Sequence, residues 1–320
     1  MFFLKRILSF IPLLLVITFL AFVLARSMPG SPFDKERAPA SPEIERALRA
    51  KYYLDEPLIK QYLRYIGVGW ERNADGKLQP FKGGLIRGDF GLSTKYRNHT
   101  VNDIIVQALP VSLTLGALAF LFAQGVGIPL GFYTAVKRGQ WGDYIGSFFA
   151  LLAFCIPALV VAPMLIVVLS IKARLFPAGM WETPLHAVLP SVALGLYFSG
   201  RVSRLMREGM STVLHEGFIT TARAKGLSES KVLLKHGFRL AVLPVVSFSG
   251  PLLADLLTGS FIVESMFRIP GIGPFLVNSL QNRDALMVVG LVLLYAILLL
   301  VLNLIVDLSY SWLDKRVKYE

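Results

Sequence analysis

The fold class of this 320-residue chain is decided by one stretch, Leu109–Val136, which reads LPVSLTLGALAFLFAQGVGIPLGFYTAV. Its 28 residues include no Asp, Glu, Lys or Arg. A helix needs about 20 mostly apolar residues to cross the hydrocarbon core of a bilayer. In lipid, a helix is also the form that satisfies the backbone hydrogen bonds of a single segment. The stretch therefore predicts a transmembrane helix.

Five further apolar runs predict the same, so we expect an all-α, polytopic membrane protein with six transmembrane helices. The predicted spans are Ile7–Ala25, Leu109–Val136, Tyr144–Ile171, Leu185–Gly200, Leu240–Val263 and Met287–Val306. Only 17% of the residues are charged, whereas soluble domains have about 25%, and this excludes an ordinary soluble enzyme. By length alone, the fourth run could also be a re-entrant or interfacial helix.

The distribution of Lys and Arg decides how the fourth run is interpreted. With six spans and a cytoplasmic N-terminus, the cytoplasmic segments hold 15 of these cations and the short outer loops hold four. The long connection Arg26–Thr100 is exempt from this comparison, because the positive-inside bias applies to loops shorter than about 60 residues. Without the fourth span, the loop Arg201–Arg239 and its eight cations would lie outside. We therefore predict that both termini are cytoplasmic, and that the net charge of +12 reflects membrane orientation and not nucleic-acid binding.

These spans predict four parts of the chain. They are a first transmembrane helix (1–25), an extracytoplasmic segment (26–100), a five-helix core with a long cytoplasmic loop at 201–239 (101–308) and a cytoplasmic tail (309–320). The first apolar run is too long for a typical signal peptide, so we expect it to remain as an uncleaved helix. In the extracytoplasmic segment, two short amphipathic helices are predicted after Ser41-Pro42 and after Pro57. The composition of Gly67–Gly91 predicts a loop.

Sequence motifs give no sign of chemistry on this chain. The single cysteine, Cys155, excludes an intramolecular disulfide framework and a Cys-based metal site. His215-Glu216 begins a zinc-binding HExxH motif, but Ile219 stands where the second histidine is needed. No G-x-x-x-x-G-K-[ST] stretch is present to hold ATP. One carboxylate, Asp255, falls in the middle of a predicted span, where we expect it to face the bundle interior or a watery path.

The loop Arg201–Arg239 carries the most information about function. Leu214, Phe218 and Ala222 recur at helical spacing, and Gly226 ends a run of small side chains. Such a short, narrow helix is suited to enter a groove on another protein. Equally, it could be an amphipathic helix held on lipid headgroups. The cations that would hold it there are Arg223, Lys225 and Lys231.

A resemblance to a known family favours the first interpretation. The string TARAKGLSESKVLLKHGFRLAVLPV (Thr221–Val245) resembles the EAA-type loop of permease subunits in ATP-binding-cassette (ABC) importers, in the version found in the peptide and nickel branch. Other stretches and a compact loop at Lys172–Pro184 are similar to the oligopeptide-permease B-subunit family in particular. The stretches are PGSPF (Pro29–Phe33), GDFG (Gly88–Gly91), NRD (Asn282–Asp284) and ESMFRIPGIG (Glu264–Gly273).

The resemblance implies a MetI-like fold and a non-catalytic permease subunit that carries oligopeptides across the bacterial inner membrane. It implies as partners a second homologous permease, two ABC ATPases that bind ATP and Mg, and an extracytoplasmic solute-binding protein. A permease for dipeptides, nickel or glutathione in the same family is an alternative. Two rivals from other classes are an ion-coupled secondary carrier and a membrane-embedded enzyme. The carrier would need coupling carboxylates and inverted repeats, and the enzyme a paired catalytic set.

The resemblance also implies two sets of functional residues. The helix expected to dock on the ATPases comprises Glu216, Phe218, Thr220, Thr221, Ala222, Arg223, Ala224, Lys225, Gly226 and Leu227. The translocation path or outer gate is expected to include Asp255, Glu264, Pro270 and Gly271. The sequence departs from the family pattern at three positions. Thr220 and Thr221 replace the usual Glu-Ala start, with Arg more common at Thr220 in the peptide branch, and Gly217 replaces a better helix former.

Overall fold

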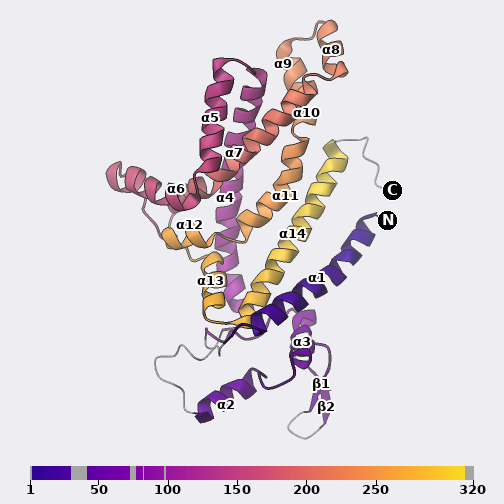
Figure 1. The fold of residues 1–320 in the computed structure, drawn as a ribbon, viewed down its shortest axis with the longest axis vertical. Helices are drawn as coiled ribbons and strands as arrows, with labels where there is room; N and C mark the ends of the chain where they lie inside the picture. Colours follow the sequence, from indigo (N-terminus) through magenta and orange to yellow (C-terminus); the bar gives the residue numbers. More distant parts are fainter. Residues whose placement is uncertain (1, 30–41, 73–76, 82, 97–98, 314–320) are drawn as a thin grey trace. The chain divides into compact units, whose positions relative to one another are not determined.

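The computed structural model describes residues 2–29, 42–72, 77–81, 83–96 and 99–313. Helices dominate this part of the chain, and one pair of short strands accompanies them (Figure 1). Contacts divide the chain into two compact units. The first unit comprises Phe3–Pro110 and Pro274–Ile297, and the second comprises Val111–Gly273 and the chain from Leu298 onward.

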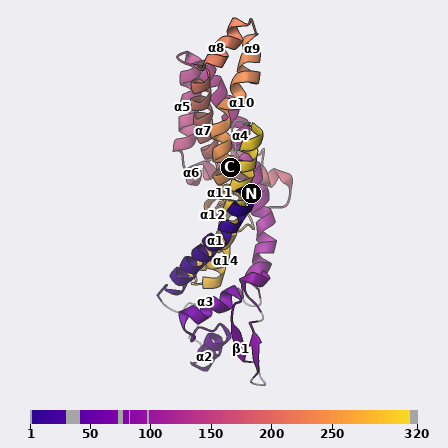
Figure 2. The same ribbon diagram turned by 90° about the vertical axis from the view of Figure 1, so that its right-hand side faces the viewer.

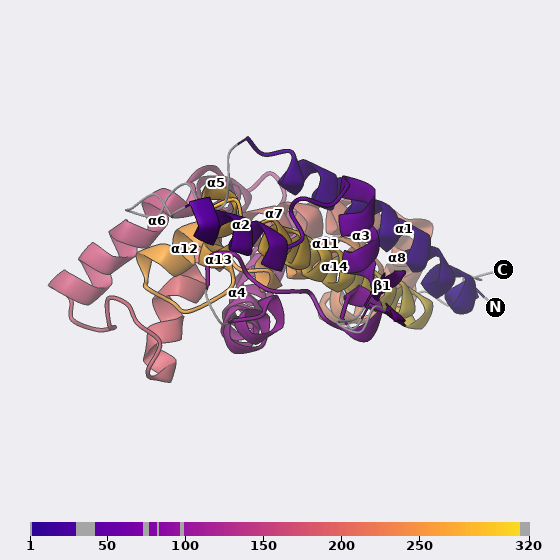
Figure 3. The ribbon, with the colours of Figure 1, turned by 90° about the horizontal axis from the view of Figure 1, so that it is seen from below.

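The first unit is built on the helix α1, which packs against the short helix α3 (Figure 3). The rings of Phe22, Tyr62 and Tyr65 form its core, together with Val289. The Tyr62 hydroxyl donates to the carbonyl oxygen of Leu15 at 2.9 Å, which ties α3 to α1. Its elements are α1 (Phe2–Arg26), α2 (Pro42–Lys51), α3 (Leu58–Ile66), β1 (Trp70–Arg72), β2 (Leu78–Pro80), the 3₁₀ turn η1 (Leu85–Arg87), the start of α4 (Val101–Val136), α13 (Gly273–Gln281) and the start of α14 (Ala285–Leu313).

In the same unit, Asp284 fixes the start of α14. Its side chain is fully buried and accepts a hydrogen bond from the Ser93 hydroxyl. The backbone N–H of Lys95 donates to the same carboxylate at 3.3 Å. A carboxylate just before a helix stabilises its first turn. The Asn282–Asp284 motif therefore has a structural role here that sequence alone did not predict.

The second unit is organised around the long helix α7. It lies side by side with α5 and contacts α6, α10, α11 and α12 (Figures 1 and 2). A Cβ atom on Gly127 of α4 would come within 2.6 Å of the Ser199 carbonyl oxygen of α7, so glycine permits this close helix contact. Its elements are α4, α5 (Trp141–Cys155), α6 (Ala158–Leu165), the π-helical segment η2 (Ile166–Lys172), the 3₁₀ turn η3 (Pro184–Ala187), α7 (Val188–Val213), α8 (Gly217–Ala224), α9 (Glu229–Lys231), the π-helical segment η4 (Val232–Gly237), α10 (Phe238–Ala241), α11 (Leu243–Leu257), α12 (Phe261–Met266) and the end of α14.

Four helical segments of the described chain are long and apolar enough to cross a membrane, and they match predicted spans. They are Leu8–Arg26, Val101–Val136, Leu243–Met266 and Ala285–Leu308. The third predicted span, Tyr144–Ile171, is not one straight helix: α5 and the segment Ala158–Lys172 are bent by 100°. The bend lies at Ile156, which is extended, and at Pro157, which has no backbone N–H to continue the helix.

The fourth predicted span begins three residues later than expected, because η3 precedes α7. α7 continues to Val213 and carries the charged side chains of the loop, and it is not among the four segments. Multi-pass membrane helices are therefore confirmed, whereas the number six stays a prediction.

Two other expectations need comment. The segment Gly67–Gly91 was predicted to be a loop, but it contains the antiparallel pair β1–β2 and the turn η1. The hairpin was missed because each strand has only three residues, which is too short for a pattern of alternation to be recognised. Both predicted amphipathic helices are present as α2 and α3. The predicted N-cap residue Ser41, most of the Pro29–Phe33 motif and the tail beyond Leu313 lie outside the described residues.

Candidate functional site: a coupling finger and a buried carboxylate

The predicted docking helix is α8, and it ends where the sequence predicted. Glu216 occupies the N-cap position in an extended conformation. At the other end, Gly226 has a φ of +74°, and its N–H donates to the Arg223 carbonyl oxygen at 2.9 Å. Because glycine adopts this left-handed conformation without steric cost, it terminates the helix sharply. We call the segment Glu216–Gly237 the coupling finger.

The buried face of α8 differs from the predicted one. Ile219 is fully buried and Ala222 is 7% exposed, and both belong to the cluster that includes Val232 and Leu233 of η4. Phe218 is 39% exposed, so the helical spacing of Leu214, Phe218 and Ala222 does not mark one buried face. Leu214 precedes α8, at the C-cap of α7. In an eight-residue helix, one pair of apolar residues at i and i+4 does not determine which face is buried to better than about one residue.

The other predicted docking residues lie mainly on the exposed side of the finger. The exposed ones are Glu216, Phe218, Thr220, Thr221, Arg223, Ala224, Lys225 and Gly226, whereas Leu227 is half-buried. Among the described residues, a Cβ atom on Gly217 or Gly226 would meet nothing within 4 Å. The finger thus presents an aromatic ring beside small side chains, with α8 and α9 at one end of the second unit (Figures 1 and 2).

One ion pair holds the exposed side in a defined conformation. Arg223 donates to Glu229 through Nη2 at 2.7 Å and through Nε at 3.2 Å. This hydrogen bonding raises the pKa of the Arg223 guanidinium and lowers the pKa of the Glu229 carboxyl. Both groups are therefore charged at neutral pH, and the bidentate geometry orients the guanidinium before any partner binds.

The helix α7, which precedes the finger in the chain, is fixed to α5 by a second ion pair. Arg207 of α7 donates through Nε and Nη2 to the two carboxylate oxygens of Asp143 of α5, each at 2.9 Å. The Asp143 side chain is 7% exposed and that of Arg207 is 37% exposed. A bidentate pair of this kind fixes the position of one helix against the other. The 64-residue separation of the pair hid it from sequence reasoning.

The predicted gate residue Glu264 is fully buried near the start of α12. Its carboxylate accepts hydrogen bonds from the Ser112 hydroxyl and from the Gly273 backbone N–H, both at 2.8 Å. Ser112 in turn accepts from the Ile272 N–H at 2.8 Å. A Cβ atom on Gly271 would come within 2.5 Å of both the Glu264 carboxylate and the Ser112 hydroxyl oxygen. We call Glu264, Ser112, Gly271 and Gly273 the carboxylate cage.

The structure brings only part of the predicted gate together. Glu264 and Gly271 share the cage, whereas Pro270 next to them is exposed. Asp255 is exposed on the surface of α11 and not inside the bundle of this chain. Ser112 was missed, since a serine within an apolar run gives no signal of its partner 152 residues away. In the described part of the chain, no group of three or more His, Cys, Asp or Glu residues is placed to hold a metal ion.

Comparisons with known proteins agree on one family. A family model described as binding-protein-dependent transport system inner membrane component matches residues 127–319. The oligopeptide transport system permease protein OppB of Haemophilus influenzae is 39% identical over 317 residues, which cover 98% of each chain. The dipeptide transport system permease protein DppB of Bacillus subtilis is 38% identical over 314 residues, which cover 98% of this chain and 96% of that protein.

The fold also resembles a solved transporter structure. Inward facing conformations of the MetNI methionine ABC transporter give a TM-score of 0.54 at 16% identity. The match covers 66% of this chain and 96% of that chain. At this identity the likeness concerns the fold, and it confirms the predicted MetI-like architecture for that part of the chain.

Proposed function

Because the chain belongs to the family of binding-protein-dependent transport system inner membrane components, we propose that it is a permease subunit that carries oligopeptides in an ATP-driven importer. Full-length similarity to permeases named for oligopeptide and dipeptide transport supports peptides as the cargo. The compact Lys172–Pro184 loop favours oligopeptides within this class. The chain itself performs no catalysis in this proposal.

The coupling finger is the observation that carries the mechanism. Its α8 is anchored inward by Ile219 and Ala222 and exposes Phe218 beside small side chains. A partner can shift the equilibrium between two states of a pore only if it binds the two states with different affinity. In our proposal ATPase subunits grip the exposed side of α8, and α7, held to α5 through Arg207 and Asp143, passes their movement to the bundle.

The proposed assembly contains four kinds of component. A second homologous permease pairs with this chain, two ABC ATPases bind ATP and Mg on the cytoplasmic side, and a solute-binding protein delivers peptide from outside. Both termini and the coupling finger are cytoplasmic in this arrangement. The excess of Lys and Arg on the predicted inner segments supports this orientation.

A pair of glycine substitutions tests the proposal. Gly226→Trp places a large side chain on the docking side of the finger, at a φ of +74°. Gly88→Trp is the matched control, since Gly88 has the same φ and the same open space but lies outside the finger. We expect Gly226→Trp to lower copurification of the ATPases and uptake of a labelled oligopeptide about tenfold, the effect of losing about 1.4 kcal/mol of binding. Gly88→Trp should keep both.

Other outcomes identify the alternatives. Normal uptake and normal ATPase binding in the Gly226→Trp variant would contradict the proposed coupling. Uptake that survives ATP depletion but stops when the ion gradient collapses would favour an ion-coupled carrier. A series of labelled peptides of increasing length separates oligopeptide from dipeptide transport, and labelled nickel and glutathione test the remaining alternatives within the family.

A further inference from the structure

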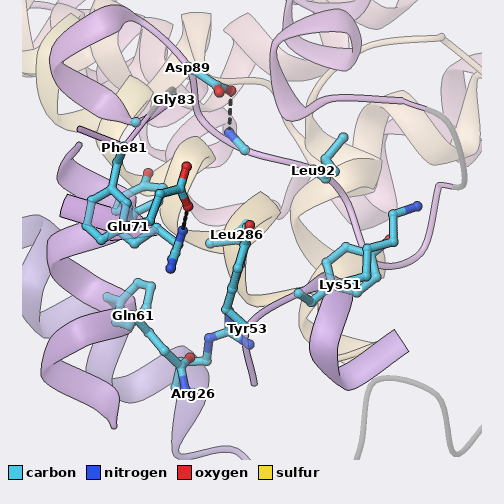
Figure 4. Close-up of a pocket in the computed structure, with 16 residues that line it drawn as sticks. Arg26, Lys51, Tyr53, Gln61, Glu71, Phe81, Gly83, Asp89, Leu92 and Leu286 are labelled. Carbon is cyan, nitrogen blue, oxygen red and sulfur yellow. Dashed lines mark hydrogen bonds and ion pairs between the residues drawn. The ribbon is translucent and has the colours of Figure 1, made fainter. Parts of the chain in front are cut away.

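The first unit contains a pocket of about 240 Å³ that the transport mechanism does not use. It is lined by Arg26, the last residue of α1, and by Leu286, the second residue of α14 (Figure 4). Both helices belong to segments that are long and apolar enough to cross a membrane. The pocket therefore lies where two spans end, at the depth of the lipid headgroups. The rings of Tyr52, Tyr53 and other aromatic residues around it are typical of this depth.

Three hydrogen-bond donors of the lining have no acceptor among the described residues: the Tyr65 hydroxyl and the Nε–H groups of Arg26 and Arg64. Tyr65 is 6% exposed, and its hydroxyl is buried without a partner in the described chain. The Nε–H of Arg26 is likewise buried without a described partner. Burial raises the pKa of the Tyr65 phenol, so it remains a donor. Leaving a buried donor unpaired is costly, and more so when it is charged. A guanidinium and a phenol in one pocket favour an oxyanion as the missing acceptor.

The two terminal nitrogens of Arg64 are already hydrogen-bonded within the wall of the pocket. Arg64 donates to Glu71 at 2.7 Å and to Glu56 at 3.1 Å, and its guanidinium stacks between the rings of Tyr53 and Phe81. Arg64 is thus a fixed part of the wall.

Two other charged side chains line the pocket, and neither accepts a hydrogen bond from the Nε–H of Arg26. Asp89 accepts from the backbone N–H of Gly91 at 2.9 Å (Figure 4). Lys51 is exposed and lies 5.7 Å from the centre of the Tyr52 ring. Arg26 is attracted by Asp284, but its Nε–H still has no acceptor in the part of the chain that the structure describes. Among the described residues, the guanidinium groups with an Nε–H open to a ligand are therefore those of Arg26 and Arg64, with Lys51 at the edge.

From these observations we infer that the pocket binds the phosphate group of a membrane phospholipid. Arg26 and Tyr65 donate to the phosphate oxygens, and the acyl chains run along α1. The helix offers them an apolar surface next to Arg26, because Leu20 is 54% exposed and Leu24 is 70% exposed. A lipid bound in this way ties the end of the first span to the segment that follows it. The inference needs only that the chain spans a membrane, so it does not rest on the identity of the cargo.

Conservative variants test the lipid site in the full chain, purified with its partner subunits in detergent. Tyr65→Phe removes the orphaned hydroxyl and keeps the ring. Tyr62→Phe is the matched control on the same helix, since the Tyr62 hydroxyl already bonds to the Leu15 carbonyl oxygen. In a native mass spectrometry titration with phosphatidylglycerol, we expect Tyr65→Phe and Arg26→Gln to weaken binding about tenfold, which corresponds to about 1.4 kcal/mol. Tyr62→Phe should bind like the parent.

Competition experiments in the same titration distinguish a phospholipid from a soluble anion as the source of the oxyanion. Diacylglycerol with the same acyl chains, which lacks the phosphate, should not compete, and inorganic phosphate should compete only weakly. Unchanged phosphatidylglycerol binding in Tyr65→Phe would overturn the inference, even if Arg26→Gln failed to fold. Equal binding of diacylglycerol would also overturn it, because the pocket would then hold acyl chains alone. Strong competition by inorganic phosphate or by a free peptide would assign the pocket to a soluble anion instead of a lipid.

Discussion

The coupling finger and the carboxylate cage both belong to the second unit, but the finger exposes its polar side chains, whereas the cage buries them. The finger exposes Phe218 and Arg223, and its buried apolar side chains are those of Ile219, Ala222, Val232 and Leu233. The cage buries Glu264 completely. The first region is therefore suited to bind another protein, whereas the second stabilises its own fold. A predicted functional residue can thus either contact a partner protein or stabilise the fold that positions other residues. Substitutions should distinguish these two roles.

The largest effect is expected at the cage. Glu264→Ala leaves the Ser112 hydroxyl and the Gly273 N–H without their acceptor, and each such loss costs about 1–3 kcal/mol. With the cavity that remains, the free energy of unfolding should fall by about 3–5 kcal/mol. Thermal unfolding of the detergent-solubilised complex measures this change. Ser265→Ala, at the exposed neighbouring position, is the control. An unfolding midpoint equal to that of the parent would show that Glu264 is not a positioning residue.

A smaller and more local effect is expected at the finger. Ile219→Ala removes the main inward anchor of α8, and such truncations cost about 2–5 kcal/mol. Amides of α8 should then exchange hydrogen faster and ATPase association should be lost, while the spans keep their protection. Phe218→Ala should leave exchange in the free permease unchanged and weaken ATPase association about tenfold, since exposed aromatic residues often dominate interfaces. Equal exchange in both variants would contradict the assigned inner and outer faces.

The sequence predicted those elements that depend on local pattern. Long apolar runs located α1, α4 and α14, and Pro57 and Gly226 marked where short helices begin or end. Local pattern did not reveal the 100° bend after α5. Pro157 has no backbone N–H to continue α5, but the angle of the bend depends on how α6 packs against α7 and α12.

The candidate functional site was likewise predictable where it depends on local sequence, and not where it depends on tertiary packing. Resemblance selected the right segment for α8, but the buried face depends on η4, which contacts it only in the folded chain. Glu264 was selected as a gate residue, and its full burial depends on Ser112, on another helix. Such partners are set by tertiary packing and carry no periodic signal in one sequence. The docking and gating roles themselves stay predictions that the substitutions above address.

The smallest effect is expected for the exposed ion pair of the finger. Glu229→Gln removes the acceptor of Arg223, yet both side chains are solvent-exposed, and such pairs contribute little to stability. The Arg223 hydrogen bond lowers the pKa of Glu229 below its ordinary value of 4.5. Its contribution is therefore complete above that value and is lost only as the pH falls through the lowered pKa. Thermal unfolding of parent and Glu229→Gln should coincide throughout the neutral range. Asp143→Asn, which breaks the more buried pair with Arg207, should lower the midpoint measurably in the same assay, so a larger effect of Glu229→Gln would reverse the ranking of the two pairs.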